Sequence, residues 1–96
     1  MYEDYRKKSV LFQSDEVWNE IVRLRNDLEI VLDRISDDHF ILADGFDPFR
    51  IFSFGKLDNK WGYSSLDYWY VKEDIASEVE KEYFERLVEA LNNNEN

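Results

Sequence analysis

The sequence predicts an α+β protein with an N-terminal helix, a three-stranded antiparallel β-meander and a C-terminal helix, both helices lying on one face of the sheet. Apolar residues recur at helical spacing over residues 14–36 and again over residues 74–92. Between them, residues 39–71 divide into short strand-like runs bounded by turn residues. Placing both helices on one face buries their apolar stripes and leaves the other face open. The 96 residues predict a single domain, with an N-terminal arm at 1–13 and a polar tail at 93–96.

Residues 14–36 show the clearest helical pattern, because apolar side chains recur at alternating spacings of three and four. The stripe consists of Val17, Ile21, Leu24, Leu28, Val31 and Ile35. Ser14 is the expected N-cap, and Asp15 and Glu16 suit the positive end of the helix dipole. We expect this helix to end near Ser36, where turn residues begin.

Residues 74–92 predict a second helix with one apolar face and one acidic face. Asp74 is its expected N-cap. The apolar face carries Ala76, Val79, Tyr83, Leu87 and Leu91. The outer face carries Glu78, Glu82, Glu85 and Glu89. Such a run is most often a solvated helix face, but carboxylates held at intervals can also imitate a phosphate backbone.

Three runs between the helices are typical of β-strands. Residues 40–43 are a short apolar run, and residues 49–57 alternate in type. Residues 60–71 form the third run after a tight turn at Asp58 and Asn59, since both residues tolerate a positive φ. The three runs therefore predict a meander in which each strand pairs with the next.

The third strand carries aromatic side chains on both of its faces. One face holds Tyr63, Asp67 and Trp69, and the other holds Leu66, Tyr68 and Tyr70. We expect the first set on the open face of the sheet, where tyrosine and tryptophan can contact a protein partner. Two alternatives stay open: the reverse arrangement of the strand, and an N-terminal arm that folds over the exposed rings.

The chain is strongly acidic, with 22 acidic and 12 basic residues and a net charge of −10. Residues 15–47 hold ten acidic and three basic residues, and residues 73–96 hold eight and two. This balance argues against binding to nucleic acid, where phosphate contacts supply much of the affinity, and against an anionic membrane surface. A basic protein would instead be attracted.

Cysteine is absent, which excludes disulfides, a thiolate zinc site and a cysteine nucleophile. We therefore expect a reducing, cytoplasmic location. The N-terminal stretch has no apolar run of signal-peptide length, and no window approaches the roughly 18 apolar residues of a membrane span.

Catalytic and metal sites find little support in the sequence. His39 is the single histidine, and no residue pattern supplies a nucleophile or an oxyanion hole beside it. The aspartates around it do not follow the spacing of an EF-hand loop. With three glycines, the chain has no phosphate-binding loop. We expect no enzyme activity, no metal and no cofactor.

We therefore expect a small non-enzymatic inhibitor that binds and occludes a basic, nucleic-acid-handling protein. Toxin-immunity proteins and phage-encoded inhibitors of defence nucleases, including anti-CRISPR proteins, have this size, acidity and lack of catalytic residues, which is an analogy of type only. The expected partner-binding residues are Asp37, Asp38, Asp44, Asp47, Tyr63, Asp67, Trp69, Glu78, Glu82 and Glu85. The alternative is an adaptor or homodimer that uses an exposed aromatic sheet face. Binding to a basic partner weakens with salt, whereas an aromatic homodimer does not.

Overall fold

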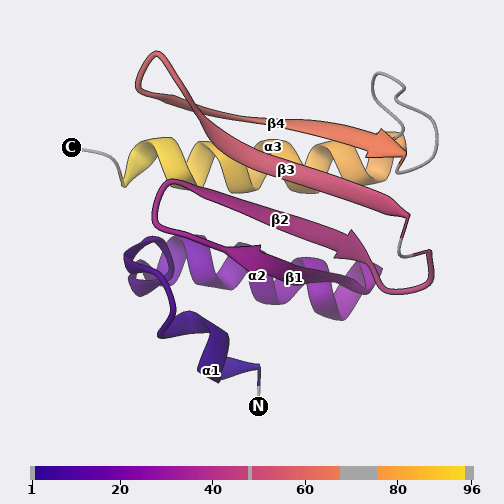
Figure 1. Ribbon diagram of the computed structural model, residues 1–96, viewed down its shortest axis with the longest axis horizontal. Helices are drawn as coiled ribbons and strands as arrows, with labels where there is room; N and C mark the ends of the chain where they lie inside the picture. Colours follow the sequence, from indigo (N-terminus) through magenta and orange to yellow (C-terminus); the bar gives the residue numbers. More distant parts are fainter. Residues whose placement is uncertain (1, 48, 68–75, 95–96) are drawn as a thin grey trace.

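The computed structural model describes residues 2–47, 49–67 and 76–94. Within them, an antiparallel sheet of four strands in the order β1-β2-β3-β4 stands in front of two long helices (Figure 1). The elements are α1 (Glu3–Arg6), the 3-10 helix η1 (Val10–Gln13), α2 (Asp15–Leu28), β1 (Ile30–Ile35), β2 (His39–Asp44), β3 (Arg50–Leu57), β4 (Lys60–Asp67) and α3 (Glu78–Asn93).

Helix α2 begins as the sequence predicts but ends eight residues earlier than the predicted Ser36. Ser14 is the N-cap, and its side chain accepts a hydrogen bond from the Val17 backbone N–H at 3.3 Å. The helix stops at Leu28 because Glu29 takes the left-handed conformation, with φ 54°. A Cβ at Gly45 would lie 2.8 Å from the Glu29 carbonyl oxygen. Glycine is therefore needed at position 45, where the chain after β2 contacts Glu29.

The predicted helix end is wrong because residues 30–35 form strand β1, which also makes the sheet four-stranded instead of three-stranded. Ile30 and Leu32 are buried while Val31 between them is half-buried, which follows the period of two of a strand as far as Asp33, where the pairing with β2 shifts register. β-branched residues at positions 30 and 31 favour this conformation. Pairing with β2, in which Leu32 lies opposite Leu42, supplies the hydrogen bonds that a longer helix would have supplied.

Helix α3 begins at Glu78, and its cap is Ser77 instead of the predicted Asp74, which lies outside the described residues. The Glu80 N–H donates to the Ser77 hydroxyl at 3.1 Å, and the Ser77 N–H donates to the Glu80 carboxylate at 2.8 Å. This reciprocal capping box satisfies two backbone donors that the first helical turn leaves free. The start of α3 is therefore determined by Ser77 and Glu80.

We expect Ser77→Ala to lower the free energy of unfolding by about 1 kcal/mol, the usual effect of removing an N-cap hydroxyl. Urea denaturation followed by circular dichroism measures the change. Ser77→Asp is the matched control, because aspartate keeps an acceptor at the cap and should retain most of the stability. Equal losses in the two variants would show that the hydroxyl does not act as a cap.

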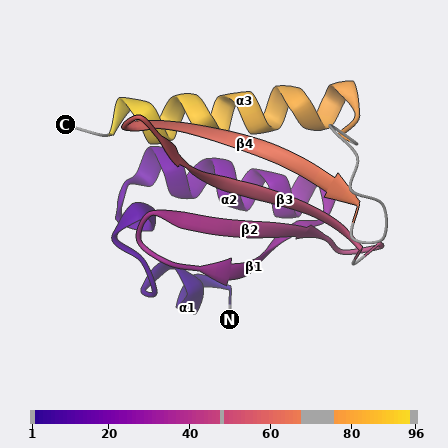
Figure 2. The same ribbon diagram turned by 45° about the horizontal axis from the view of Figure 1, so that its top comes forward.

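Both long helices lie on the same side of the sheet, where Figure 2 shows them next to each other. The sheet contributes Phe40, Leu42, Phe52, Phe54 and Trp61 to the single core cluster. The helices contribute Val17, Trp18, Ile21, Leu24, Phe84, Leu87, Ala90 and Leu91. Aromatic rings form the centre, with Phe40 stacked on Phe54 at 5.0 Å and Phe52 against Phe84 at 4.7 Å. The opposite face of the sheet has no helix over it in the described part of the chain.

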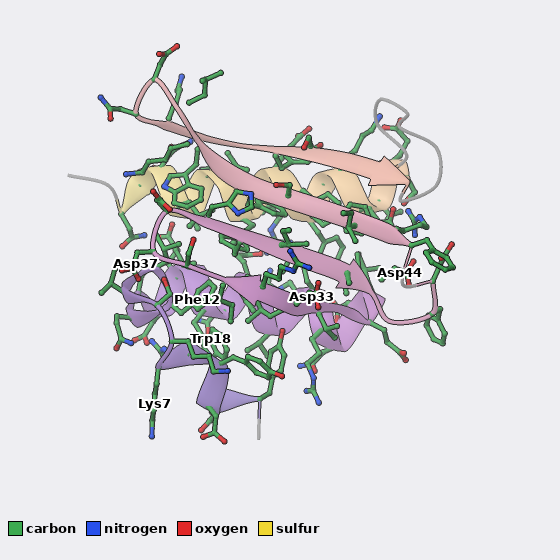
Figure 3. The ribbon with its side chains drawn as sticks, viewed as in Figure 1. Lys7, Phe12, Trp18, Asp33, Asp37 and Asp44 are labelled. Atoms are coloured by element: carbon green, nitrogen blue, oxygen red, sulfur yellow. The ribbon has the colours of Figure 1, made fainter. Side chains whose placement is uncertain are left out.

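The N-terminal arm packs beside β1 and α2 and does not cover the open face. Phe12 is fully buried, and its ring lies 5.6 Å from Trp18 and 5.5 Å from Phe40, on the helix side of the sheet (Figure 3). The Arg6 guanidinium donates to the backbone carbonyls of Phe12 and Gln13. The arm therefore extends the core, and the alternative in which it shields the open face is wrong for the described residues.

The outer edge of β4 is partly closed by a side chain from the last turn of α3. The Trp61 N–H donates to the Asn92 side-chain oxygen at 2.9 Å, and the Asn92 amide donates to the Trp61 carbonyl at 3.5 Å. Asn92 thus satisfies two backbone groups that another strand would otherwise pair with.

Candidate interaction surfaces

The four aspartates predicted to bind a partner lie at opposite ends of the sheet. Asp37 and Asp38 are in the turn between β1 and β2, whereas Asp44 and Asp47 follow the other end of β2 (Figure 3 labels Asp37 and Asp44). A strand of six residues spans about 20 Å, so the two pairs cannot form one cluster. Asp37 and Asp38 lie in a hairpin turn, and not at the predicted helix end, because residues 30–35 form a strand.

Asp44 and Asp47 serve the turn between β2 and β3. One oxygen of Asp44 accepts the backbone N–H groups of Phe46 at 2.8 Å and Asp47 at 3.3 Å. Asp47 accepts the N–H of Phe49 at 3.1 Å. The other Asp44 oxygen pairs with Arg50. Both carboxylates therefore stabilise this turn in the folded chain. Reversing the charge at Asp44 would destabilise the fold.

Arg50 joins two carboxylates from different elements, and we call Asp44, Arg50 and Glu80 the Arg50 triad. Arg50 donates to both oxygens of Glu80, at 2.6 and 3.2 Å, and to Asp44. Burial acts to raise the pKa of Glu80, but hydrogen bonds from Arg50 and from the Ser77 N–H outweigh it and leave that pKa below its usual value. The hydrogen bond to Glu80 raises the pKa of Arg50, against the opposing effect of burial. The triad connects the start of α3 to the end of β2.

Tyr63 faces the helices, which corrects its predicted place on the open face. Its ring lies 5.7 Å from Phe54 and 5.3 Å from Phe84, and Trp61 is buried on the same side. The rings fill the space between β4 and α3. Strand alternation alone does not show which face of β4 lies toward α3. Asp67 ends β4 opposite Arg50 in the ladder. Trp69, and the alternative pair Tyr68 and Tyr70, lie outside the described residues.

Three of the predicted residues do come together, as exposed carboxylates on α3. Glu78, Glu82 and Glu85 form one stripe, which Glu89 extends. Glu89 and Glu16 of α2 line the same shallow hollow between the helices. Glu78 pairs with Lys81 at 3.6 Å, whereas within the described residues the other four carboxylates have no ion pair. We call Glu16, Glu78, Glu82, Glu85 and Glu89 the acidic helix surface.

Other acidic residues on these helices form ion pairs and hydrogen bonds where α2 and α3 contact each other. Glu20 pairs with Arg86 at 3.4 Å and with Arg23 at 3.8 Å. The Tyr83 hydroxyl donates to Asp27 at 2.7 Å, and this hydrogen bond raises the pKa of Tyr83. These contacts hold the two helices in a common orientation, so the acidic helix surface is presented on a rigid support.

The open sheet face consists of the outward side chains of the four strands. It holds Val31, Asp33, Arg34, His39, Ile41, Ala43, Ile51, Ser53, Gly55, Leu57, Lys60, Gly62 and Ser64. The apolar residues among these are aliphatic. Of the two rings that the sequence predicts for this face, Tyr63 turns to the helices and Trp69 lies outside the described residues. Val31, Ala43 and Ile51 lie opposite one another across three strands.

The structure places a serine beside His39, which sequence reasoning missed. The Ser53 hydroxyl lies 2.7 Å from the Nε2 atom of His39, a distance compatible with a nucleophile and a base. Among the described residues, the other ring nitrogen has no hydrogen-bond partner to orient it. His39 is exposed and Ser53 is half-buried on the open side of the sheet. A Cβ at Gly55 would approach the imidazole to 3.1 Å, so glycine gives the ring room. Only the register of β2 against β3 reveals this pair.

Two features are absent among the described residues: a cluster of metal-ligating side chains and a membrane-spanning helix. No group of three His, Cys, Asp or Glu side chains among them could hold a metal ion. None of the helices they form has the length and apolar character needed to cross a lipid bilayer. Comparison with protein families, with curated proteins and with solved structures finds no match to this chain.

Proposed function

We propose that the protein is a small, non-enzymatic, cytoplasmic inhibitor that binds a basic, nucleic-acid-handling protein and occludes its binding site. The acidic helix surface carries this proposal. Four of its five carboxylates have no ion pair within the described residues, on a chain whose net charge is −10. A surface of one sign on a rigid support speeds the encounter with an oppositely charged partner and selects against partners of like charge.

The spacing of the carboxylates supports a resemblance to nucleic acid. Successive glutamates of the stripe are three or four residues apart, which at about 1.5 Å per residue gives one charge every ~5 Å. A single strand of DNA carries one phosphate about every 3.4 Å along its axis. The charge density of the stripe is thus comparable to that of a DNA strand. Lys and Arg side chains that normally hold phosphates could bind it. A toxin bound by an immunity protein and a defence nuclease bound by a phage inhibitor both fit this chemistry.

Reversing three charges of the stripe tests the proposal. We expect Glu82→Lys, Glu85→Lys and Glu89→Lys together to weaken binding to the basic protein captured from host cells by at least about tenfold, from the loss of several charge pairs. The variant should remain folded, because exposed substitutions usually change stability by less than about 0.5 kcal/mol each. Titration calorimetry at low and high salt measures both the loss and the salt dependence.

The matched control reverses Glu3, Asp37 and Asp38 to lysine. The sequence predicts Asp37 and Asp38 as partner-binding residues, but they lie outside the acidic helix surface, so the contact proposed here does not include them. Each reversal adds two charges, so both triple variants change the net charge equally, from −10 to −10 + 6 = −4. The control should keep most of the affinity if the helix surface makes the contact. Equal weakening by both variants would indicate a general effect of net charge, and capture of a neutral or acidic protein would contradict the proposal.

A further inference from the structure

The open sheet face differs in charge from the rest of the molecule. Its described side chains include one acidic residue, Asp33, and two basic residues, Arg34 and Lys60, for a net of 2 − 1 = +1. The remaining chain carries a strong negative excess. A basic partner therefore has no electrostatic reason to bind this face. An acidic partner would be repelled by the molecule as a whole.

The centre of the open face is apolar. Val31, Ile41, Ala43 and Ile51 are half-buried, and Leu57, at the same face, is 79% exposed. Gly62 has no heavy atom within 4 Å of the position that a Cβ would take. Small residues at this position let another sheet approach closely, and aliphatic residues are those that fill the space between two packed sheets.

We propose that the open sheet face binds the same face of a second copy of this chain, forming a two-fold homodimer in which two sheets pack face to face. A two-fold contact brings a surface against itself, so it suits a face that carries both Asp33 and Arg34 beside an apolar centre. Oppositely charged neighbours allow the arginine of one copy to meet the aspartate of the other.

The same arrangement keeps the negative charges of the two copies apart. Packed sheets lie about 10 Å from each other, and each helix layer stands roughly another 10 Å behind its own sheet. The two acidic helix surfaces would then be separated by more than about 30 Å, well beyond the Debye length of about 8 Å at physiological ionic strength. Charge repulsion therefore does not forbid this dimer, and added salt should favour it slightly.

The size of the face predicts weak association. Four strands about 4.8 Å apart, each with roughly six residues at about 3.3 Å, give on the order of 400 Å² for each copy. Stable interfaces bury about 800 Å² for each partner. We expect a dissociation constant in the micromolar range or weaker, so that dimers form at high protein concentration.

Analytical ultracentrifugation from about 5 to 500 μM tests this inference, with the chain alone in buffer. Ile51→Lys places a charge at the centre of the proposed contact and should raise the dissociation constant at least about tenfold. Val79→Lys is the matched control: Val79 lies on α3, is 53% exposed and undergoes the same change away from the contact. It should leave the dissociation constant unchanged. Raising the salt from 0.05 to 0.5 M should leave the dimer intact.

A second variant, Ile41→Lys, addresses the same face from β2 in case Ile51→Lys does not fold by circular dichroism. A monomer at every concentration would overturn the proposal, as would a dimer that both open-face variants leave intact or that Val79→Lys disrupts. The test is independent of the proposed inhibitor function. The triple reversal on α3 should spare the dimer, and the open-face variants should spare binding to the basic partner.

Discussion

Replacing Phe84 with alanine should lower the free energy of unfolding by about 3–5 kcal/mol, the usual range for a large aromatic residue in a core. Phe84 is fully buried where α3 meets the sheet. Its ring lies 4.7 Å from Phe52, 5.5 Å from Phe54 and 5.3 Å from Tyr63. Alanine would remove all three ring contacts and leave a cavity that the surrounding β-strands cannot readily close.

This loss is large compared with the stability of the whole domain. At about 0.05–0.15 kcal/mol per residue, a chain of 96 residues has a total stability of roughly 5–14 kcal/mol. Urea denaturation followed by tryptophan fluorescence measures the change. Val79→Ala on the same helix serves as the control, because Val79 is exposed and its truncation should change stability by less than about 0.5 kcal/mol. A loss below about 1 kcal/mol for Phe84→Ala would contradict the packing described.

Replacing Arg50 with methionine should lower the free energy of unfolding by about 2–3 kcal/mol at pH 7. Methionine keeps the length of the side chain but leaves Asp44 and Glu80 without the charge between them. Breaking a fully buried pair costs about 3–5 kcal/mol. The Arg50 side chain is 22% exposed, so partial access to water reduces the effect. The stability of Arg50→Lys should lie between those of the wild type and Arg50→Met, since lysine keeps the charge but not the planar donor pair.

The effect of Arg50→Met should depend on pH, and the sign follows from Glu80. The folded-state pKa of Glu80 is lowered, with burial opposing and the bonds from Arg50 and Ser77 prevailing. A carboxylate with a lowered pKa contributes its stability above its unfolded pKa of about 4.3 and loses it as the pH falls through the folded value. The difference in the free energy of unfolding between wild type and variant should therefore have its full value at pH 7 and should become smaller below about pH 4. Thermal unfolding at both pH values measures it, and a constant difference would exclude the triad as its source.

Several local features follow from the sequence because they depend on neighbouring residues. Ser14 caps α2, and the apolar stripe from Val17 to Leu24 is buried. Asp58 and Asn59 form the hairpin turn with φ values of 55° and 65°. Each of these depends on side chains within a few positions of one another, where spacing and backbone preference act directly.

Other features were predicted wrongly because two periodicities were compatible with the same residues. Leu28, Val31 and Ile35 continue a helical stripe, yet Ile30 and Leu32 also alternate as in a strand. The strand prevails because β2 provides a partner for it. That pairing also moves Asp37 into a hairpin turn and separates it from Asp44. These two residues, both predicted to bind a partner, therefore lie at opposite ends of β2.

By itself, the sequence determined the α+β class, the acidity of the outer helix faces and the lack of cysteine chemistry, because composition and short-range periodicity encode them. It also determined that Glu78, Glu82 and Glu85 share a face, since helical spacing alone places them. Only the tertiary structure decided that Tyr63 turns toward α3, that Asp44 is held by Arg50, and that Ser53 meets His39. These depend on strand register and on which face the helices cover, and both are set by contacts between residues far apart in the chain.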